Sequence, residues 1–211
     1  VALWGRGVDS TLFHPDRKDD PETATLRRRL APGGEVLIGY VGRLAPEKEL
    51  HRLVELNDLP GTRVVLVGDG PSADHLGEQL PGAALLGRQE GLDLARSYAA
   101  FDLFVHTGTR ETFGQTLQEA AAAGLPVIAP ARGGPLDLID HGRTGLLFDP
   151  DRPGALREAV ASLVGADLAE ARSAMGAAGR VRVEERSWPA LTEQLLGYYA
   201  YAMGHHRTAV A

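Results

Sequence analysis

The chain has 211 residues, of which 44% are hydrophobic and 24% are charged, as in soluble globular proteins rather than disordered ones. Its net charge of -6 argues against a nucleic-acid-binding domain, because such domains depend on a basic surface. The absence of cysteine excludes disulfides, thiolate metal sites and a cysteine nucleophile. No apolar run approaches the roughly 18 residues of a membrane span, and the first residues lack a signal-peptide pattern.

Short apolar runs alternate with longer segments of helical period from Val36 onward, which is the pattern of βαβ units. Strands are expected at 36–41, 63–67, 83–86, 103–105, 126–129 and 145–148. Helices are expected at 46–56, 71–80, 92–100, 115–123 and 135–139, and then at 154–164, 167–184 and 188–203, the last capped by Ser187. The sequence therefore predicts an α/β fold, a Rossmann-like parallel sheet with helices on both faces.

The two ends of the chain depart from this pattern. Residues 1–20 are rich in Gly, Asp and Pro and are expected to form an interdomain linker, and residues 205–211 a disordered tail. Residues 21–204 would then form one domain. Because the chain starts with Val1 rather than Met, we expect it to be a piece of a longer protein.

The turn from Gly42 to Lys48 follows the first strand and is expected to open a helix. Ligands of open α/β sheets bind at the carboxyl ends of the strands, where the positive end of a helix also attracts anions. Arg43 and Lys48 could converge on one anion there. Considered alone, the stretch fits two solvated cations beside Glu47 and Glu49 equally well.

Two further turns are expected at the same edge of the sheet. Gly68 and Gly70 follow the second strand, but the Lys-Ser or Lys-Thr of a P-loop is missing, so by themselves they predict a tight turn. Glu111 precedes the helix that carries Glu119, seven residues intervening. Such carboxylates can accept hydrogen bonds from different sugar hydroxyls, while the N–H groups of residues 113–115 face an anion. The alternatives are a solvated helix glutamate and an acid favoured by the helix dipole.

The histidines show no metal-ligand spacing, and surface positions are the default expectation for them. His106 is the exception, because it ends a strand directly before the Glu111 loop. The triplet Arg27 to Arg29 is expected to be a solvated helix face, with a phospholipid-binding patch as the alternative.

Several motifs follow one another in a fixed order over nearly the whole chain. They are Gly7-Val8-Asp9, Gly42-Arg43-Leu44 with Glu47-Lys48, Val67 to Pro71, Leu86-Gly87, Glu111 to Gly114 with Glu119, Ala122 to Ala129, Gly133-Gly134 and Gly142 to Phe148. In this order and spacing the chain resembles the C-terminal half of a GT-B glycosyltransferase of the retaining GT4 type.

The resemblance implies that this half binds a nucleotide-sugar donor and that an absent N-terminal domain holds the acceptor. Arg43 and Lys48 would bind the diphosphate, Glu111 the transferred sugar and Glu119 the ribose. The backbone of Phe113, Gly114 and Gln115 would meet the phosphate and sugar. The segment from Leu86 and Gly87 to Glu90 would line the base pocket, and Gly42, Gly68 and Gly70 would complete the donor site. The family needs no metal ion and no other cofactor. Its retention of configuration implies a front-face route through an oxocarbenium-like ion pair.

Within the family, the segments 105–108 and 131–137 look like those of GDP-mannose-dependent α-mannosyltransferases, although UDP-glucose and UDP-N-acetylglucosamine enzymes share most of the same residues. The resemblance implies a lipid or glycan acceptor, no nucleic-acid partner and a cytoplasmic protein, with the full-length enzyme able to lie at the inner face of the membrane. A sugar-nucleotide epimerase of the GT-B fold is the second enzyme hypothesis. The isolated chain is expected to bind nucleotide without catalysing transfer.

Overall fold

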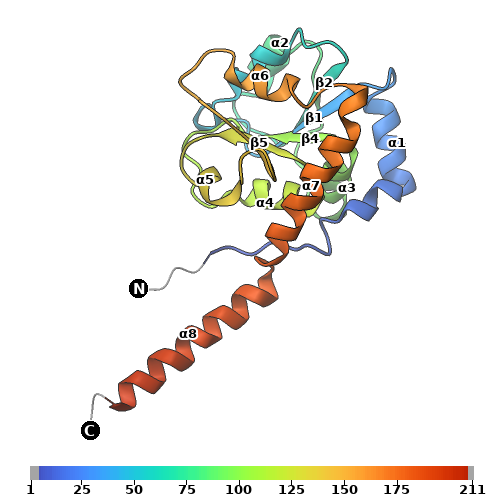
Figure 1. The fold of residues 1–211 in the computed structure, drawn as a ribbon. Helices are drawn as coiled ribbons and strands as arrows, with labels where there is room; N and C mark the ends of the chain where they lie inside the picture. Colours follow the sequence, from blue (N-terminus) through green and yellow to red (C-terminus); the bar gives the residue numbers. More distant parts are fainter. Residues whose placement is uncertain (1–4, 209–211) are drawn as a thin grey trace.

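A six-stranded parallel sheet forms the centre of the computed structural model, which describes residues 5–208 (Figure 1). The strands are β1 Val36–Val41, β2 Thr62–Val67, β3 Ala84–Leu85, β4 Leu103–Val105, β5 Val127–Pro130 and β6 Gly145–Phe148. Their order across the sheet is β3-β2-β1-β4-β5-β6, and every pairing is parallel. The order reverses between β1 and β4, which is where open α/β sheets bind ligands. The predicted α/β class is confirmed.

Helices connect the strands and cover both faces of the sheet. The α-helices are α1 Pro21–Leu30, α2 Ala73–Gln79, α3 Gly91–Ala100, α4 Gln115–Ala122, α5 Pro135–Leu138, α6 Ala155–Ala161, α7 Ala169–Glu184 and α8 Trp188–Thr208. Shorter 3₁₀ helices are η1 Pro15–Asp19, η2 Pro46–Lys48, η3 Leu50–Leu56 and η4 Ala166–Leu168.

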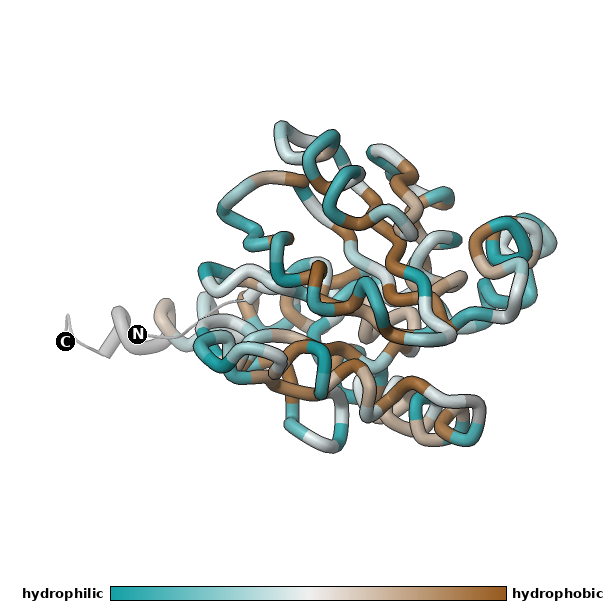
Figure 2. Tube along the Cα trace, turned by 90° about the horizontal axis from the view of Figure 1, so that it is seen from above, coloured by the Kyte–Doolittle hydropathy of each residue, from teal (hydrophilic) through white to brown (hydrophobic). Residues whose placement is uncertain are grey.

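The hydrophobic core is divided in two by the sheet, because successive strand residues point to opposite faces. On one face Leu37 and Phe104 pack with side chains from α1, α3, α4 and α7. On the other face Ile38 and Leu66 pack with side chains from η3, α2 and α6. Figure 2 shows the result: hydrophobic residues run through the interior of the domain and hydrophilic ones occupy its outer turns. Packing on both faces thereby fixes the position of the sheet and of its strand ends.

The N-terminal segment packs onto the domain over its described part, although residues 1–20 were predicted to be a linker. Val8 and Phe13 are buried, and the Phe13 ring meets the ring of Tyr98 edge-on at a centroid distance of 5.4 Å. Residues 15–19 form η1, which contacts α3. Residues 1–4 of the predicted linker lie outside the described residues. The apolar side chains at positions 8 and 13 explain the packing, since their burial removes hydrophobic surface from water.

The C-terminal helix α8 projects away from the body of the domain (Figure 1). The predicted cap is confirmed, because Ser187 Oγ accepts a hydrogen bond from the Ala190 N–H. The helix continues to Thr208, so residues 205–208 of the predicted tail are helical, and residues 209–211 lie outside the described part. Its exposed large side chains are Trp188, Leu196, Tyr199, Tyr201 and Met203. Among the helices of residues 5–208, none is long and apolar enough to cross a membrane.

The helix predicted over residues 46–56 is wrong in form: it consists of two 3₁₀ helices, η2 and η3. The break lies at Glu49, whose backbone is left-handed with φ of 53°. The Glu49 carboxylate accepts hydrogen bonds from Arg52 and from Thr109, which lies in the loop after β4. A contact with a distant loop therefore stabilises a conformation that the local periodicity does not show.

The predicted solvated arginine face is also wrong at one position. Arg27 donates two hydrogen bonds to the Asp102 carboxylate, at 2.8 and 3.0 Å, and another to the Ala100 carbonyl oxygen. Asp102 in turn accepts a hydrogen bond of 2.8 Å from the N–H of Leu37. Arg27 thus anchors α1 to the starts of β1 and β4, while Arg28 and Arg29 are exposed as predicted.

Candidate functional site

The turns after β1 and β2 meet through their backbones at the carboxyl edge of the sheet. The Gly42 N–H donates to the Val67 carbonyl at 3.0 Å. A Cβ atom at Gly68 would lie 1.9 Å from the Gly42 carbonyl oxygen, and one at Gly70 would lie 2.3 Å from the Leu44 carbonyl oxygen. Glycine is therefore required at positions 68 and 70 by close backbone approach, and these glycines fix the turn that carries Arg43.

An open hollow of about 440 Å³ lies beside this pair of turns. Its lining includes Gly42, Arg43, Gly68, Asp69, Arg88 and Gln89. Leu86 and Gly87, predicted to begin a base pocket, lie at the end of β3, where the Gly87 carbonyl accepts a hydrogen bond of 2.8 Å from Gly68. They position the segment, and the next two side chains, Arg88 and Gln89, reach the hollow. Sequence analysis included these two residues only as part of the segment up to Glu90.

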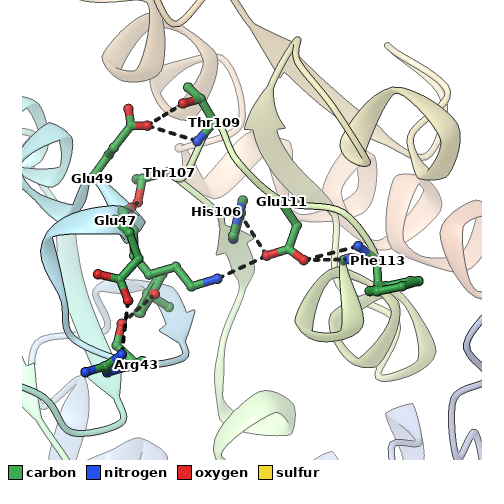
Figure 3. Close-up of polar contacts among 11 residues, drawn as sticks. Arg43, Glu47, Glu49, His106, Thr107, Thr109, Glu111 and Phe113 are labelled. Atoms are coloured by element: carbon green, nitrogen blue, oxygen red, sulfur yellow. Dashed lines mark hydrogen bonds and ion pairs between the residues drawn. The ribbon is translucent and has the colours of Figure 1, made fainter.

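Lys48 and Glu111 form an ion pair across the gap between the β1 and β4 loops. The Lys48 Nζ atom lies 3.1 Å from Glu111 Oε2. Glu111 Oε1 accepts hydrogen bonds from the N–H groups of Gly114, at 3.0 Å, and Phe113, at 3.3 Å (Figure 3). Partial burial acts to raise the pKa of Glu111, but the Gly114 amide and the Lys48 ammonium outweigh it and lower that pKa. The carboxylate is therefore ionised at neutral pH. The N–H groups of Phe113 and Gly114, which were predicted to face an anion of the ligand, thus donate to the Glu111 carboxylate instead.

His106, directly after β4, lies beside the Glu111 carboxylate of this ion pair (Figure 3). Its side chain is 2% exposed, and its Nε2 atom lies 3.8 Å from Glu111 Oε2. Burial, together with the Lys48 charge, lowers the pKa of His106 to about 4 despite the opposing effect of Glu111. His106 is therefore a neutral imidazole beside a carboxylate.

Arg43 and Lys48 do not share a partner in this structure. Arg43 Nη1 lies 3.3 Å from Glu47 Oε1, in a pair that is largely exposed, whereas Lys48 points toward Glu111. The 3₁₀ helix that starts at Pro46 has three residues, so the helix dipole predicted at this turn is not available. Both cations nevertheless lie on the same turn, at the switch point of the sheet.

Glu119 faces the interior of the domain on the second turn of α4. Its Oε2 atom accepts a hydrogen bond of 2.8 Å from the hydroxyl of Tyr98, which is fully buried. Burial raises the pKa of Glu119, although its hydrogen bonds with Tyr98 and Gln115 oppose that rise. The Gln115 side chain also donates to the Gly7 carbonyl at 3.1 Å. The structure therefore separates the two glutamates: Glu111 faces the β1 loop and Glu119 faces α3.

Three polar contacts at the site involve residues that sequence analysis did not single out. Thr107 Oγ1 donates to the Lys48 carbonyl at 2.6 Å, Thr109 bonds to Glu49, and Tyr40 donates to the Arg43 carbonyl at 3.2 Å. The two threonine contacts hold the β1 loop against the β4 loop, and the Tyr40 contact holds the β1 turn to its own strand. The only signal in the sequence is the Thr-Gly-Thr run that follows His106.

The described residues contain no group of three or more His, Cys, Asp or Glu side chains placed to hold a metal ion. The Phe113 ring, half exposed at the start of α4, lies under the Arg6 guanidinium at 4.8 Å. The site therefore offers cations, carboxylates, backbone amides and an aromatic face at one edge of the sheet.

Known proteins with similar sequences and folds identify the family of this chain. Residues 22–182 match the family model of the glycosyl transferases group 1. A GDP-mannose-dependent alpha-mannosyltransferase of Mycobacterium tuberculosis (strain CDC 1551 / Oshkosh) is 44% identical over 212 residues, which cover 100% of this chain and 54% of that protein. The chain thus spans about half the length of this relative.

Two solved structures show the same fold. Sucrose-phosphate synthase from Thermosynechococcus elongatus superposes with a TM-score of 0.83 at 27% identity, covering 97% of this chain and 53% of that one. The C-terminal domain of a glycosyl transferase group 1 family protein from Francisella tularensis superposes with a TM-score of 0.67 at 22% identity, covering 85% of this chain and 98% of that domain. The family match decides between the two enzyme hypotheses in favour of the transferase. The chain belongs to the group 1 glycosyl transferases and has the fold of one half of a GT-B enzyme.

Proposed function

We propose that this chain is the donor-binding half of a glycosyltransferase that transfers mannose from GDP-mannose to a lipid or glycan acceptor. The observation that carries the proposal is the Lys48–Glu111 pair, 3.1 Å apart, at the switch point of the sheet beside the hollow near Arg43. Relatives at 43–45% identity that are named GDP-mannose-dependent alpha-mannosyltransferase support the choice of donor. The acceptor would be held by a domain outside this chain, at the inner face of the membrane if it is a lipid.

The proposed roles follow from the charges at the site. Lys48 and Arg43 would neutralise the diphosphate, whose negative charge grows as the glycosidic bond breaks, and such stabilisation is the largest expected catalytic effect. Glu111 would accept a hydrogen bond from a hydroxyl of the mannose, and Glu119 would accept one from the ribose. These two cations would carry out the charge neutralisation that a metal ion supplies in other transferases, so we propose that no metal is required.

The backbone that carries the two cations is held in place by contacts with neighbouring turns. The Lys48 backbone is bonded to Thr107, and the turn that carries Arg43 is held by its contacts with Gly68 and Gly70. The Arg43–Glu47 pair is exposed, and such surface pairs are weak, so it gives way readily to a diphosphate. Lys48 is more enclosed, and we expect the diphosphate to compete with Glu111 for its ammonium group.

The donor is tested by thermal denaturation of the chain with GDP, UDP, ADP and their sugars. A ligand at about a hundred times its Kd stabilises the folded form by about 2.7 kcal/mol, which corresponds to a rise in Tm of about 5–10 °C at this chain length. We expect the rise with GDP and GDP-mannose. Stabilisation by UDP or ADP compounds in place of GDP compounds would refute the proposed donor, and no stabilisation by any of them would refute donor binding.

The two lysines of the sequence provide a matched pair of variants for the diphosphate site. Lys48→Ala should weaken GDP binding at least thirtyfold, or about 2 kcal/mol, because it removes an enclosed cation and leaves the Glu111 charge facing the phosphate. Lys18→Ala, on η1, should leave the affinity unchanged, and Arg43→Ala should cost only about threefold because Arg43 is exposed. If calorimetry gives the same GDP affinity for Lys48→Ala and Lys18→Ala, Lys48 does not bind the diphosphate and its role is structural.

The isolated chain should bind the donor without transferring its sugar. Incubation with GDP-mannose and an acceptor should release mannosylated product only when the missing domain is supplied, because the acceptor-binding groups lie there. Transfer of mannose by the isolated chain would contradict the proposal that donor and acceptor are bound by two different domains.

A further inference from the structure

The His106 side chain is buried at the site without a hydrogen-bond partner. It is 2% exposed, and within residues 5–208 neither Nδ1 nor Nε2 makes a hydrogen bond of normal geometry. A buried polar group without a partner costs about 1–3 kcal/mol, so such groups are rare unless another state of the protein satisfies them. The nearest ionised acceptor is Glu111 Oε2, 3.8 Å from Nε2.

The Glu111 carboxylate already has other partners in this state. Lys48 Nζ already holds Glu111 Oε2 at 3.1 Å, and Glu111 Oε1 is held by the Gly114 amide. Three donors thus hold this one carboxylate, namely Lys48 and the N–H groups of Phe113 and Gly114, and the His106 ring lies beside it (Figure 3).

The backbone segments around His106 are in contact with each other, so a change of partners at the site needs only side-chain movement. Thr107 Oγ1 donates a hydrogen bond to the Lys48 carbonyl, and a Cβ added at Gly108 would be in van der Waals contact with Lys48 Cα, at 3.5 Å, and with His106 Nε2, at 3.4 Å. The β1 and β4 loops are therefore in direct contact above the imidazole ring. A ligand that draws the Lys48 ammonium away changes the partners of Glu111 without moving either loop.

We propose that His106 is a positioning residue that takes hold of Glu111 when the Lys48 ammonium turns to the diphosphate of the donor. The inference rests on the proposed function, because it needs an anion that competes for Lys48. A side-chain shift of about 1 Å brings the His106 and Glu111 atoms to hydrogen-bond distance. Glu111 then stays oriented toward the sugar after losing its lysine partner.

The charges that face His106 predict that this exchange is accompanied by uptake of a proton. Glu111, the Gly108 backbone and Glu49 favour the imidazolium form, while burial and Lys48 oppose it and hold the pKa of His106 at about 4. Glu49 keeps its own partners, Arg52 and Thr109, throughout. When Lys48 turns away and a diphosphate arrives, one opposing charge leaves and negative charge is added. The pKa of His106 therefore rises in the complex.

The number of protons taken up on binding is measured by calorimetric titration of the chain with GDP-mannose in buffers of different ionisation enthalpy. GDP-mannose is the appropriate probe because its diphosphate, unlike the terminal phosphate of GDP, has no group that titrates near neutral pH. If the pKa of His106 in the complex reaches its ordinary value of about 6.5, binding at about pH 5.5 takes up close to one proton. Relative to a variant that cannot titrate, the affinity of the unchanged chain should then rise about tenfold between about pH 7.5 and pH 5.5.

Two substitutions separate the positioning role from simple packing. His106→Gln keeps an N–H donor but cannot take up the proton, so GDP-mannose affinity at about pH 7.5 should stay within about threefold while the proton uptake disappears. His106→Leu removes the donor and should weaken GDP-mannose more than GDP. The matched control is His75→Gln on the exposed side of α2, which should behave as the unchanged chain.

The outcomes separate this inference from the proposed donor. GDP-mannose binding with no proton uptake, or with the same uptake in His106→Gln, overturns the role of His106 alone. Failure of GDP-mannose to bind the unchanged chain at either pH overturns the donor proposal and this inference with it. If the variants do not fold, NMR titration of the His106 ring in the unchanged chain decides, because a ring pKa that does not rise on addition of GDP-mannose overturns the proposal.

Discussion

Replacing Gly68 with alanine should destabilise the domain more than a typical substitution does. The Gly68 backbone has φ of 144°, and an added Cβ would lie 1.9 Å from the carbonyl oxygen of Gly42 and 2.9 Å from its carbonyl carbon. Both are backbone atoms, so the clash is relieved only if the β1 and β2 turns move apart and the Gly42–Val67 hydrogen bond weakens. Overpacking costs about 1–3 kcal/mol and a strained backbone a further 1–3 kcal/mol, which gives about 2–6 kcal/mol in all.

Thermal and urea denaturation measure this loss directly. For a chain of this length, about 2–6 kcal/mol corresponds to a fall in Tm of about 4–24 °C. The matched control is Gly77→Ala in the interior of α2, where the added Cβ has no neighbour within 4 Å and should stabilise the helix by about 0.5–1 kcal/mol. The reasoning is refuted if Gly68→Ala unfolds at the same temperature and denaturant concentration as the unchanged chain.

Four further substitutions test the remaining contacts. Glu119→Ala should weaken GDP and GDP-mannose alike, by about tenfold to a hundredfold, whereas Glu111→Ala should weaken only GDP-mannose; calorimetry showing the reverse pattern would mean that the two roles are exchanged. Tyr98→Phe removes the donor to Glu119, which should cost about 1–2 kcal/mol in urea denaturation. A carboxyl group whose pKa is raised by folding opposes folding once it is ionised, so this cost should be larger at about pH 8 and shrink as the pH falls through the Glu119 pKa. Asp102→Ala leaves Arg27 and a strand amide without their acceptor and should cost about 2–3 kcal/mol, and an unchanged unfolding midpoint would show that α1 is anchored by packing alone.

The regular part of the fold follows from the sequence because its signals are local. The strands at 36–41 and 103–105 have the predicted bounds, since apolar runs that end at glycine or a polar residue are visible without any tertiary information. The break at Glu49 could not be predicted in this way. It depends on hydrogen bonds to Thr109, 60 positions further along the chain, and a contact of that range leaves no mark on the local period.

The residues of the candidate site could also be predicted in part from the sequence, but their contacts could not. Arg43, Lys48 and Glu111 stand out in the sequence because charged residues after buried strands lie at the sheet edge. That Lys48 pairs with Glu111 rather than sharing an anion with Arg43 follows only from the side-chain geometry. His106 stands out by its place at a strand end, but its missing hydrogen-bond partner is a property of the folded state.

The close approach of the β1 and β2 turns also has a consequence for protein engineering. At the hollow, Gly68 contributes main chain that admits no side chain, as does Gly70 further along the same turn, whereas Arg88 and Gln89 line the hollow from a segment whose path is held by the Gly87–Gly68 hydrogen bond. A mutant library aimed at changing the accepted nucleotide should therefore randomise positions 88 and 89 and leave the glycines fixed. Its members would differ in what lines the hollow and share one scaffold.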